Sequence, residues 1–219
     1  LLKLILGAVE ETLAQATHLE PRPKVEIQHL KGHLSKPRGR ELEAFCRELH
    51  PDFTGMYRNE PLRPDVLGRG LPVSTRYRIT VEASSHNQKH PWGEILPTNQ
   101  NEPLRLSLSL RKGRELLPVT QWNVKGDGQK QTYRVEAWID QQWVPELNWE
   151  NGPTKRELRT DLLMKKYRAD QVTKAPDRKV ITDKKEYEKA NNEWWRQMSL
   201  SLLKNFEGPS LRIHSLKIE

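Results

Sequence analysis

The chain has 219 residues, with 37 Lys and Arg against 29 Asp and Glu and a formal net charge of +8 at pH 7. Hydrophobic residues make up only 35% of it, but seven Trp, five Tyr and three Phe within periodic segments argue against a disordered chain. The single cysteine, Cys46, excludes an intramolecular disulfide framework, so we predict a cytoplasmic, reducing location.

The first quarter of the chain is predicted to hold two helices and a basic strap. Apolar residues at helical spacing indicate an amphipathic helix up to about Thr17. Residues 21–40 are basic and contain Pro and Gly, which favours an exposed strap. A second amphipathic helix is predicted over 40–50, ended by the next proline, and a loop over 51–72. No apolar run approaches the ~20 residues that cross a bilayer, so no membrane contact is expected.

The middle of the chain is predicted to be β-structure. Apolar and polar residues alternate over 76–82, 104–110 and 131–139, as in strands with one buried face. Residues 115–124 form the expected partner of the second strand, and 143–144 begin a further strand after a tight turn. This spacing of strands and turns predicts an antiparallel meander with one face exposed to solvent.

The last third is predicted to return to helix. Thr154 and Glu157 form a capping-box pattern at the start of one basic helix. A longer amphipathic helix is expected from Asp183 to Asn205, and a final strand over 211–218, with a possible bulge near Ser215.

The predicted fold class is therefore α+β, an antiparallel sheet of four to six strands flanked by amphipathic helices at the N- and C-terminal ends. Residues 1–55 would hold the N-terminal helices and strap, and 56–150 the loop and sheet. Residues 151–219 would hold the basic helix, the long helix and the final strand, in one compact unit with 56–150.

Positive charge is concentrated in four stretches, with a net +5 over 22–40, +3 over 58–78, +4 over 105–114 and +5 over 155–189. Such stretches attract polyanions, and arginine matches the geometry of a phosphate. The side chains predicted to contact nucleic-acid phosphates are Arg38, Arg40, Arg69, Arg76, Arg78, Arg105, Arg111, Lys112, Arg114, Arg134, Lys155, Arg159, Lys165 and Lys166.

Tryptophans accompany the predicted strands and could stack on unpaired bases. Those expected to stack bases or to grip a partner subunit are Trp92, Trp122, Trp138, Trp143 and Trp195. RNA or single-stranded nucleic acid is favoured over duplex DNA, because no helix-turn-helix or zinc finger is visible. The sequence thus predicts a non-catalytic, nucleic-acid-contacting subunit of a larger ribonucleoprotein assembly, with other protein subunits as partners.

Two alternatives stay open. The first is a metal-dependent nuclease or another nucleic-acid-processing enzyme using His86, His90 and Glu94. Its discriminating Glu-x-Lys element is missing, because neither Glu82 nor Glu136 is followed by that lysine, so no catalytic residue, metal or cofactor is predicted. The second is a protein–protein adaptor without direct nucleic-acid contact, whose charge only keeps it soluble.

Overall fold

A computed structural model describes most of the chain from residue 47 onward and a short piece before it. The described residues are 28–32, 34, 47–90, 93, 96, 98–126, 128–154, 156–158, 162–163, 165, 175–204 and 206–219. The helix expected up to Thr17, most of the strap over 21–40 and most of the helix after Thr154 lie outside them.

The described residues form nine strands and one long helix. In chain order these are β1 (Gln28–Lys31), β2 (Arg47–His50), β3 (Phe53–Met56), β4 (Thr75–His86), β5 (Leu104–Lys112), β6 (Glu115–Val124), β7 (Gln131–Ile139), β8 (Val144–Trp149), α3 (Lys184–Lys204) and β9 (Ser210–Ile218). A single 3₁₀ turn, Asp65–Leu67, lies between β3 and β4. None of the described helices is long and apolar enough to cross a membrane.

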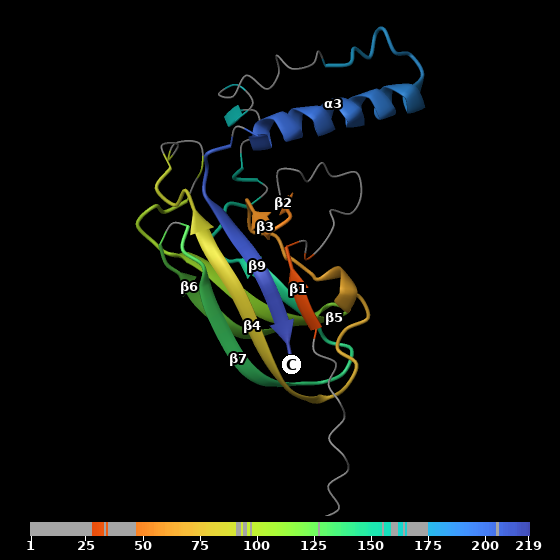
Figure 1. Ribbon diagram of the computed structural model, residues 1–219. Coiled ribbons are helices and arrows are strands. Elements are labelled where there is room, and N and C mark those ends of the chain that lie inside the picture. The colour runs from red at the N-terminus through yellow and green to blue at the C-terminus, as the bar shows by residue number, and fades with distance from the viewer. Residues whose placement is uncertain are drawn as a thin grey trace, which may run out of the picture.

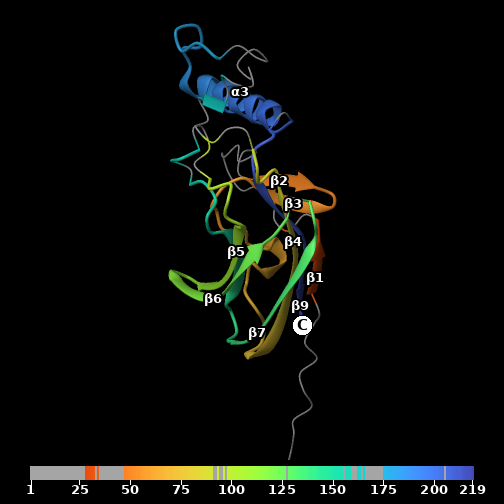
Figure 2. The same ribbon diagram turned by 90° about the vertical axis from the view of Figure 1, so that its left-hand side faces the viewer.

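The strands form two antiparallel sheets that pack face to face (Figures 1 and 2). The six-stranded sheet has the order β2-β3-β9-β4-β7, and β1 pairs with β9 as well. The three-stranded sheet has the order β6-β5-β8. Helix α3 lies beyond one end of this sandwich, at the top of Figure 1.

The core lies between the two sheets, because each strand turns its alternating apolar side chains inward. In β5, Leu104, Leu106, Leu108 and Leu110 are all at most 4% exposed. The opposite sheet contributes Tyr77, Ile79, Val81, Leu216 and Ile218 to the same cluster. A second, smaller cluster joins α3 to neighbouring segments through Met198 and Leu202.

The predicted α+β class is wrong, because the expected single sheet is two sheets and the described residues include one long helix rather than helices at both ends. The meander breaks after β6. The turn over 125–130 carries β7 to the other sheet, where it pairs with β4 from Thr75↔Ile139 to Ala83↔Gln131. Alternation indicates that a strand has one buried face, but not which sheet it joins.

Other elements agree with the sequence or correct it locally. Helix α3 and strand β9 confirm the last two predicted elements, and a register shift between Glu82 and Ala83 confirms a bulge in the β4–β9 ladder. The end of the helix predicted over 40–50 is strand instead, because Arg47–His50 forms a hairpin with β3, and β3 in turn pairs with β9. Thr154 and Glu157 do form the expected capping box.

Removing a core side chain from β5 tests this packing. Leu106→Ala deletes a side chain that is 0% exposed, and we expect the free energy of unfolding to fall by about 2–5 kcal/mol through lost burial and a residual cavity. Leu116→Ala is the control, because Leu116 is 52% exposed and should change stability by about 0.5 kcal/mol or less. Urea denaturation followed by tryptophan fluorescence measures both, and equal losses would contradict the assigned core.

Candidate functional site

The predicted array of arginines is divided between the two outer faces of the sandwich. Arg76 and Arg78 of β4 and Arg134 of β7 project from the six-stranded sheet, where they alternate with inward-facing residues. Arg105 and Arg111 of β5 project from the opposite sheet. The full thickness of the core therefore separates the two groups, and they do not form one phosphate track.

Several of these arginines are already paired with carboxylates. Glu136 accepts hydrogen bonds from Arg78, and its carboxylate lies 3.4 Å from Arg76. The Arg78 hydrogen bond holds the pKa of Glu136 below its usual range, because it favours the ionised carboxylate. Arg105 lies 3.7 Å from Glu102.

Glu146 forms a buried ion cluster on the outer face of the three-stranded sheet. Its side chain is 2% exposed and accepts hydrogen bonds from both Arg63 and Arg111. Leu62 pairs with Leu147 through two backbone hydrogen bonds of 2.7 and 3.0 Å, which brings this segment across β8. Arg63 and Arg111 therefore fasten the segment to the sheet, and we assign Arg111 a structural role.

The other predicted phosphate contacts are scattered. Exposed cations that form no ion pair within 4 Å among the described residues are Arg69, Lys112, Arg114, Arg134 and Lys165, and Arg134 interacts at longer range with Glu219. The structure does not describe Arg38, Arg40, Lys155, Arg159, Lys166 or Trp92.

The described tryptophans are also dispersed. Trp138 is 67% exposed on the outer face of β7, where it lies opposite Arg76 in register. Trp195 is 38% exposed on α3. Trp122 and Trp143 pack against the core and are only partly exposed. Trp138 is therefore the predicted stacking residue that a ligand on the six-stranded sheet could reach.

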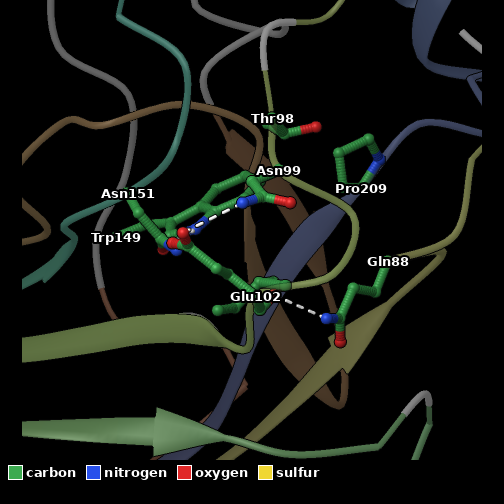
Figure 3. Close-up of a pocket in the computed structure, with 8 residues that line it drawn as sticks. Gln88, Thr98, Asn99, Glu102, Trp149, Asn151 and Pro209 are labelled. Carbon is green, nitrogen blue, oxygen red and sulfur yellow. Dashed lines mark hydrogen bonds between the residues drawn. The ribbon is translucent and has the colours of Figure 1, made fainter. Parts of the chain in front are cut away.

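A small depression at one end of the sandwich is lined mainly by amide and carboxylate side chains (Figure 3). Their polar groups are largely used within the protein. Gln88 donates to the Glu102 carbonyl at 2.6 Å, and Asn99 donates to the Glu102 carboxylate at 2.9 Å. Asn151 accepts from the Trp149 indole at 3.1 Å and from the Arg105 amide at 2.8 Å. These bonds hold the surrounding loops, so we assign the depression a structural role.

Ser84 and His214 form a buried pair across β4 and β9. Ser84 Oγ lies 2.8 Å from His214 Nε2, and the Asp52 carbonyl oxygen lies 3.3 Å from Nδ1. Since a carbonyl only accepts, Nδ1 carries the proton and Ser84 donates to Nε2. A nucleophile and its base have the same arrangement, but Ser84 is 2% exposed and His214 9%, so we assign the pair to the packing of the bulged ladder.

Two buried histidines have lowered pKa values. Burial lowers the pKa of His214, and the nearby Lys130 and Arg212 lower it further. Burial also lowers the pKa of His90, whose Nε2 lies 2.6 Å from Thr98 Oγ1. Within the described residues, no three His, Cys, Asp or Glu side chains gather as a metal site would require. Glu94, the third member of the enzyme alternative, lies outside those residues.

A group of incompletely buried apolar side chains lies between β6 and β7, the edge strands of the two sheets. Near the turn that connects them they are in contact, with Trp122 and Tyr133 rings 5.6 Å apart and Tyr133 donating to the Asn123 carbonyl. Beyond this contact they belong to separate layers, as Figure 2 shows. We call the partly covered apolar side chains here the lateral opening, and they are Leu117, Val119, Trp122, Val135 and Ala137.

Leu117 shows most clearly that this side of the core is incomplete. It pairs with Leu110, which is 2% exposed, so its side chain faces the interior of the sandwich. Leu117 is nevertheless 50% exposed, because sheet order places no strand beyond β7 on that side. One feature of the sequence marks this edge. The run Leu116-Leu117-Pro118-Val119 breaks alternation, which is typical of an irregular edge with apolar residues on both faces.

Comparisons with known proteins add little. No protein-family model matches the chain, and no curated protein matches it. Among solved structures, the C-terminal CBM6 of LamC, a marine laminarinase from Zobellia galactanivorans, aligns with 88% of this chain and 98% of its own, at 9% identity and a TM-score of 0.33. A TM-score this low supports no inference about the ligand of this chain.

The buried histidines predict how stability depends on pH. His214 and His90 titrate near pH 6.5 when unfolded but lower when folded, so the unfolded state binds more protons as pH falls. Their contribution is complete above about pH 6.5 and is lost as pH falls through the folded values. We expect the free energy of unfolding to decrease from pH 7 to 5, and less steeply in a His90→Gln, His214→Gln variant.

Urea denaturation at several pH values measures this slope. The control is His29→Gln, because His29 is exposed and should leave the slope unchanged. A double variant with the slope of the unaltered protein would show that these two histidines do not carry the effect.

Proposed function

We propose that the chain is a non-catalytic protein-binding domain that receives a partner at the lateral opening. The observation that carries this proposal is Leu117, an inward-facing leucine that is 50% exposed beside an unpaired strand edge. Burial of apolar surface is the dominant favourable contribution to most protein–protein association, so a partner could bind at this side of the core. Exposed apolar patches of this kind commonly mark interaction sites.

The distribution of charge also supports a protein adaptor. Arg76, Arg78, Arg105 and Arg111 each have a carboxylate partner, and they are divided between two opposite faces. A polyanion on either face would have to compete with those carboxylates. The positive net charge then serves mainly to keep the domain soluble, as in the second alternative drawn from the sequence.

Site-specific photo-crosslinking tests the adaptor proposal. A benzoylphenylalanine replaces Leu117, and the control variant carries it at Thr80, on the outer face of the six-stranded sheet. In extract of the source organism we expect a discrete protein adduct from position 117 only, and its loss when Ala137→Glu is added. The purified partner should then bind at least ~10-fold more weakly to Ala137→Glu than to the unaltered protein, a difference of about 1.4 kcal/mol.

The same adducts from both positions, or an adduct indifferent to Ala137→Glu, would contradict a docking site at the opening. Circular dichroism and urea denaturation of Ala137→Glu show whether the variant retains the fold of the unaltered protein.

Nucleic-acid contact stays a second candidate because of one local arrangement. Trp138 is 67% exposed opposite Arg76, and Arg134 lies on the same face with only a longer-range carboxylate neighbour, Glu219. The exposed ring of Trp138 could stack on a base while Arg76, Arg78 and Arg134 of the same face contact the backbone.

Salt dependence separates the two candidates. Three phosphate contacts to a single strand predict roughly a 20-fold loss of affinity between 50 and 200 mM salt, whereas an adaptor has no such dependence. Fluorescence anisotropy with labelled U20 and dT20 measures it. We expect no saturable, salt-dependent binding. Binding that falls with salt and is lost in Trp138→Ala with Arg134→Ala would instead favour the nucleic-acid candidate.

A further inference from the structure

We infer that the partner binds as an extended strand paired with the free edge of β7, and that this strand alternates apolar with polar residues and carries acidic side chains. This inference rests on the proposed function and adds the mode of binding and the chemistry of the partner. Four observations carry it, namely the regularity of the β7 edge, the direction of its backbone groups, the half-covered side chains above it and the charges around it.

The β7 edge differs from the other sheet edges that the structure describes. Strands β1 and β2 have four residues each, and the edge of β8 is paired with the segment around Leu62. Strand β6 contains Pro118 next to a register shift, which interrupts its edge. Strand β7 has nine residues, contains no proline and keeps one register along β4. Of these edges, β7 is the long regular one without a paired neighbour.

The backbone groups on that edge can be assigned from the neighbouring ladder. Arg78 exchanges two backbone hydrogen bonds with Glu219, at 2.9 and 3.0 Å, so its backbone groups point toward β9 and away from β7. In an antiparallel ladder such pairs alternate, so Arg78 and its β7 partner Glu136 do not bond to each other. The N–H and C=O groups of Arg134, Glu136 and Trp138 therefore point toward the free edge.

A strand added at this edge would extend the six-stranded sheet by one position. Its inward side chains would continue the inner layer beside Val135 and Ala137 and would face Leu117, which now lacks a strand opposite it. Its outward side chains would lie beside Arg134, Glu136 and Trp138. Since side chains alternate along a strand, the partner needs apolar residues at every second position and polar residues between them.

Charge around the edge favours an acidic partner. Glu136 is already paired with Arg76 and Arg78, whereas the exposed Arg134 forms no ion pair within 4 Å among the described residues. Its longer-range carboxylate neighbour is Glu219, which Lys217 already neutralises at 2.8 Å. Opposite charges across a strand pair stabilise it and like charges destabilise it. A second copy of this chain, with a net charge of +8 and its own Arg134, fits this edge less well.

A random 12-residue peptide display library selected on the folded protein, with counter-selection on Ala137→Glu, provides the probe. We expect the selected peptides to alternate apolar and polar residues and to be rich in Asp and Glu. Synthesised individually, they should bind at least ~10-fold more weakly to Ala137→Glu and to Arg134→Glu than to the unaltered protein. Gln121→Glu, an added acid at an exposed position on the outer face of the three-stranded sheet, is the control for charge alone and should change affinity little.

Backbone chemistry distinguishes strand pairing from simple apolar docking. N-methylation at alternate peptide positions, those whose N–H groups face β7, should abolish binding, whereas N-methylation at the intervening positions should not. In amide exchange of the protein, Arg134, Glu136 and Trp138 should gain protection with peptide bound, while Val135 and Ala137 are protected in both states.

The outcomes separate this inference from the proposed function. Peptides that depend on Ala137 but are indifferent to both N-methylation patterns would overturn strand pairing and leave the adaptor proposal standing. Failure to select any peptide that depends on Ala137 would also overturn strand pairing, and the crosslinking from position 117 would then decide the adaptor proposal. A dimer in analytical ultracentrifugation that Ala137→Glu dissociates would assign the edge to a second copy of the chain.

Discussion

The pairing of β4 with β9 is the constraint on which the other parts of the sandwich depend. Strand β9 comes from the end of the chain, yet it lies in the middle of the six-stranded sheet and pairs with β4, β3 and β1. Strand β9 (residues 210–218) therefore holds three strands from distant parts of the chain in one sheet, namely residues 28–31, 53–56 and 75–86. Because β9 occupies one side of β4, only the other side was available to β7, and β7 became an edge strand.

The same topology decides where charge can act. The sequence gives the number of basic residues, but the arrangement of the strands in the two sheets determines which of them lie close together. Strand pairing brings Glu136 beside Arg78, and the crossing segment brings Arg63 beside Glu146. The Glu136–Arg78 pair is exposed and contributes little to stability, whereas Glu146 is buried and needs its arginine partners. The effect of these pairs here is to neutralise the arginines that the sequence presented as phosphate ligands.

The sequence predicted individual elements far better than their assembly. The alternation of apolar and polar residues correctly predicts strands β5 and β7, and apolar residues at helical spacing correctly predict α3. These patterns are visible in the sequence because they depend only on residues that are near one another in the chain. The division into two sheets depends on long-range pairing, which a period of two residues does not encode. For the same reason, the arginines were expected on one face although β4 and β5 belong to different sheets.

The candidate site was missed because exposure, rather than residue type, defines it. Leu117 is an ordinary strand leucine in the sequence, and only the sheet order shows that nothing lies opposite it. Trp138, in contrast, is one of the tryptophans that the sequence predicts to stack bases or to grip a partner, and it is exposed because the alternation of β7 turns it away from Ala137. Aromatic and basic residues thus indicate a site on the outer face of the six-stranded sheet, whereas the incomplete part of the core lies beside the free edge of β7.

An unpaired regular strand edge is normally a liability, since it can pair with any exposed strand. Here the side chains on the outer face of β7 restrict what can pair. Arg134 repels a basic strand, and the carboxylate of Glu136 is neutralised by Arg76 and Arg78, so an acidic strand meets little repulsion. Pro118 protects the neighbouring edge of β6 from pairing of its own. The β7 edge is therefore open to pairing with an acidic strand but not with a basic one. This selectivity favours its assignment as a docking site rather than as an unprotected end of the sheet.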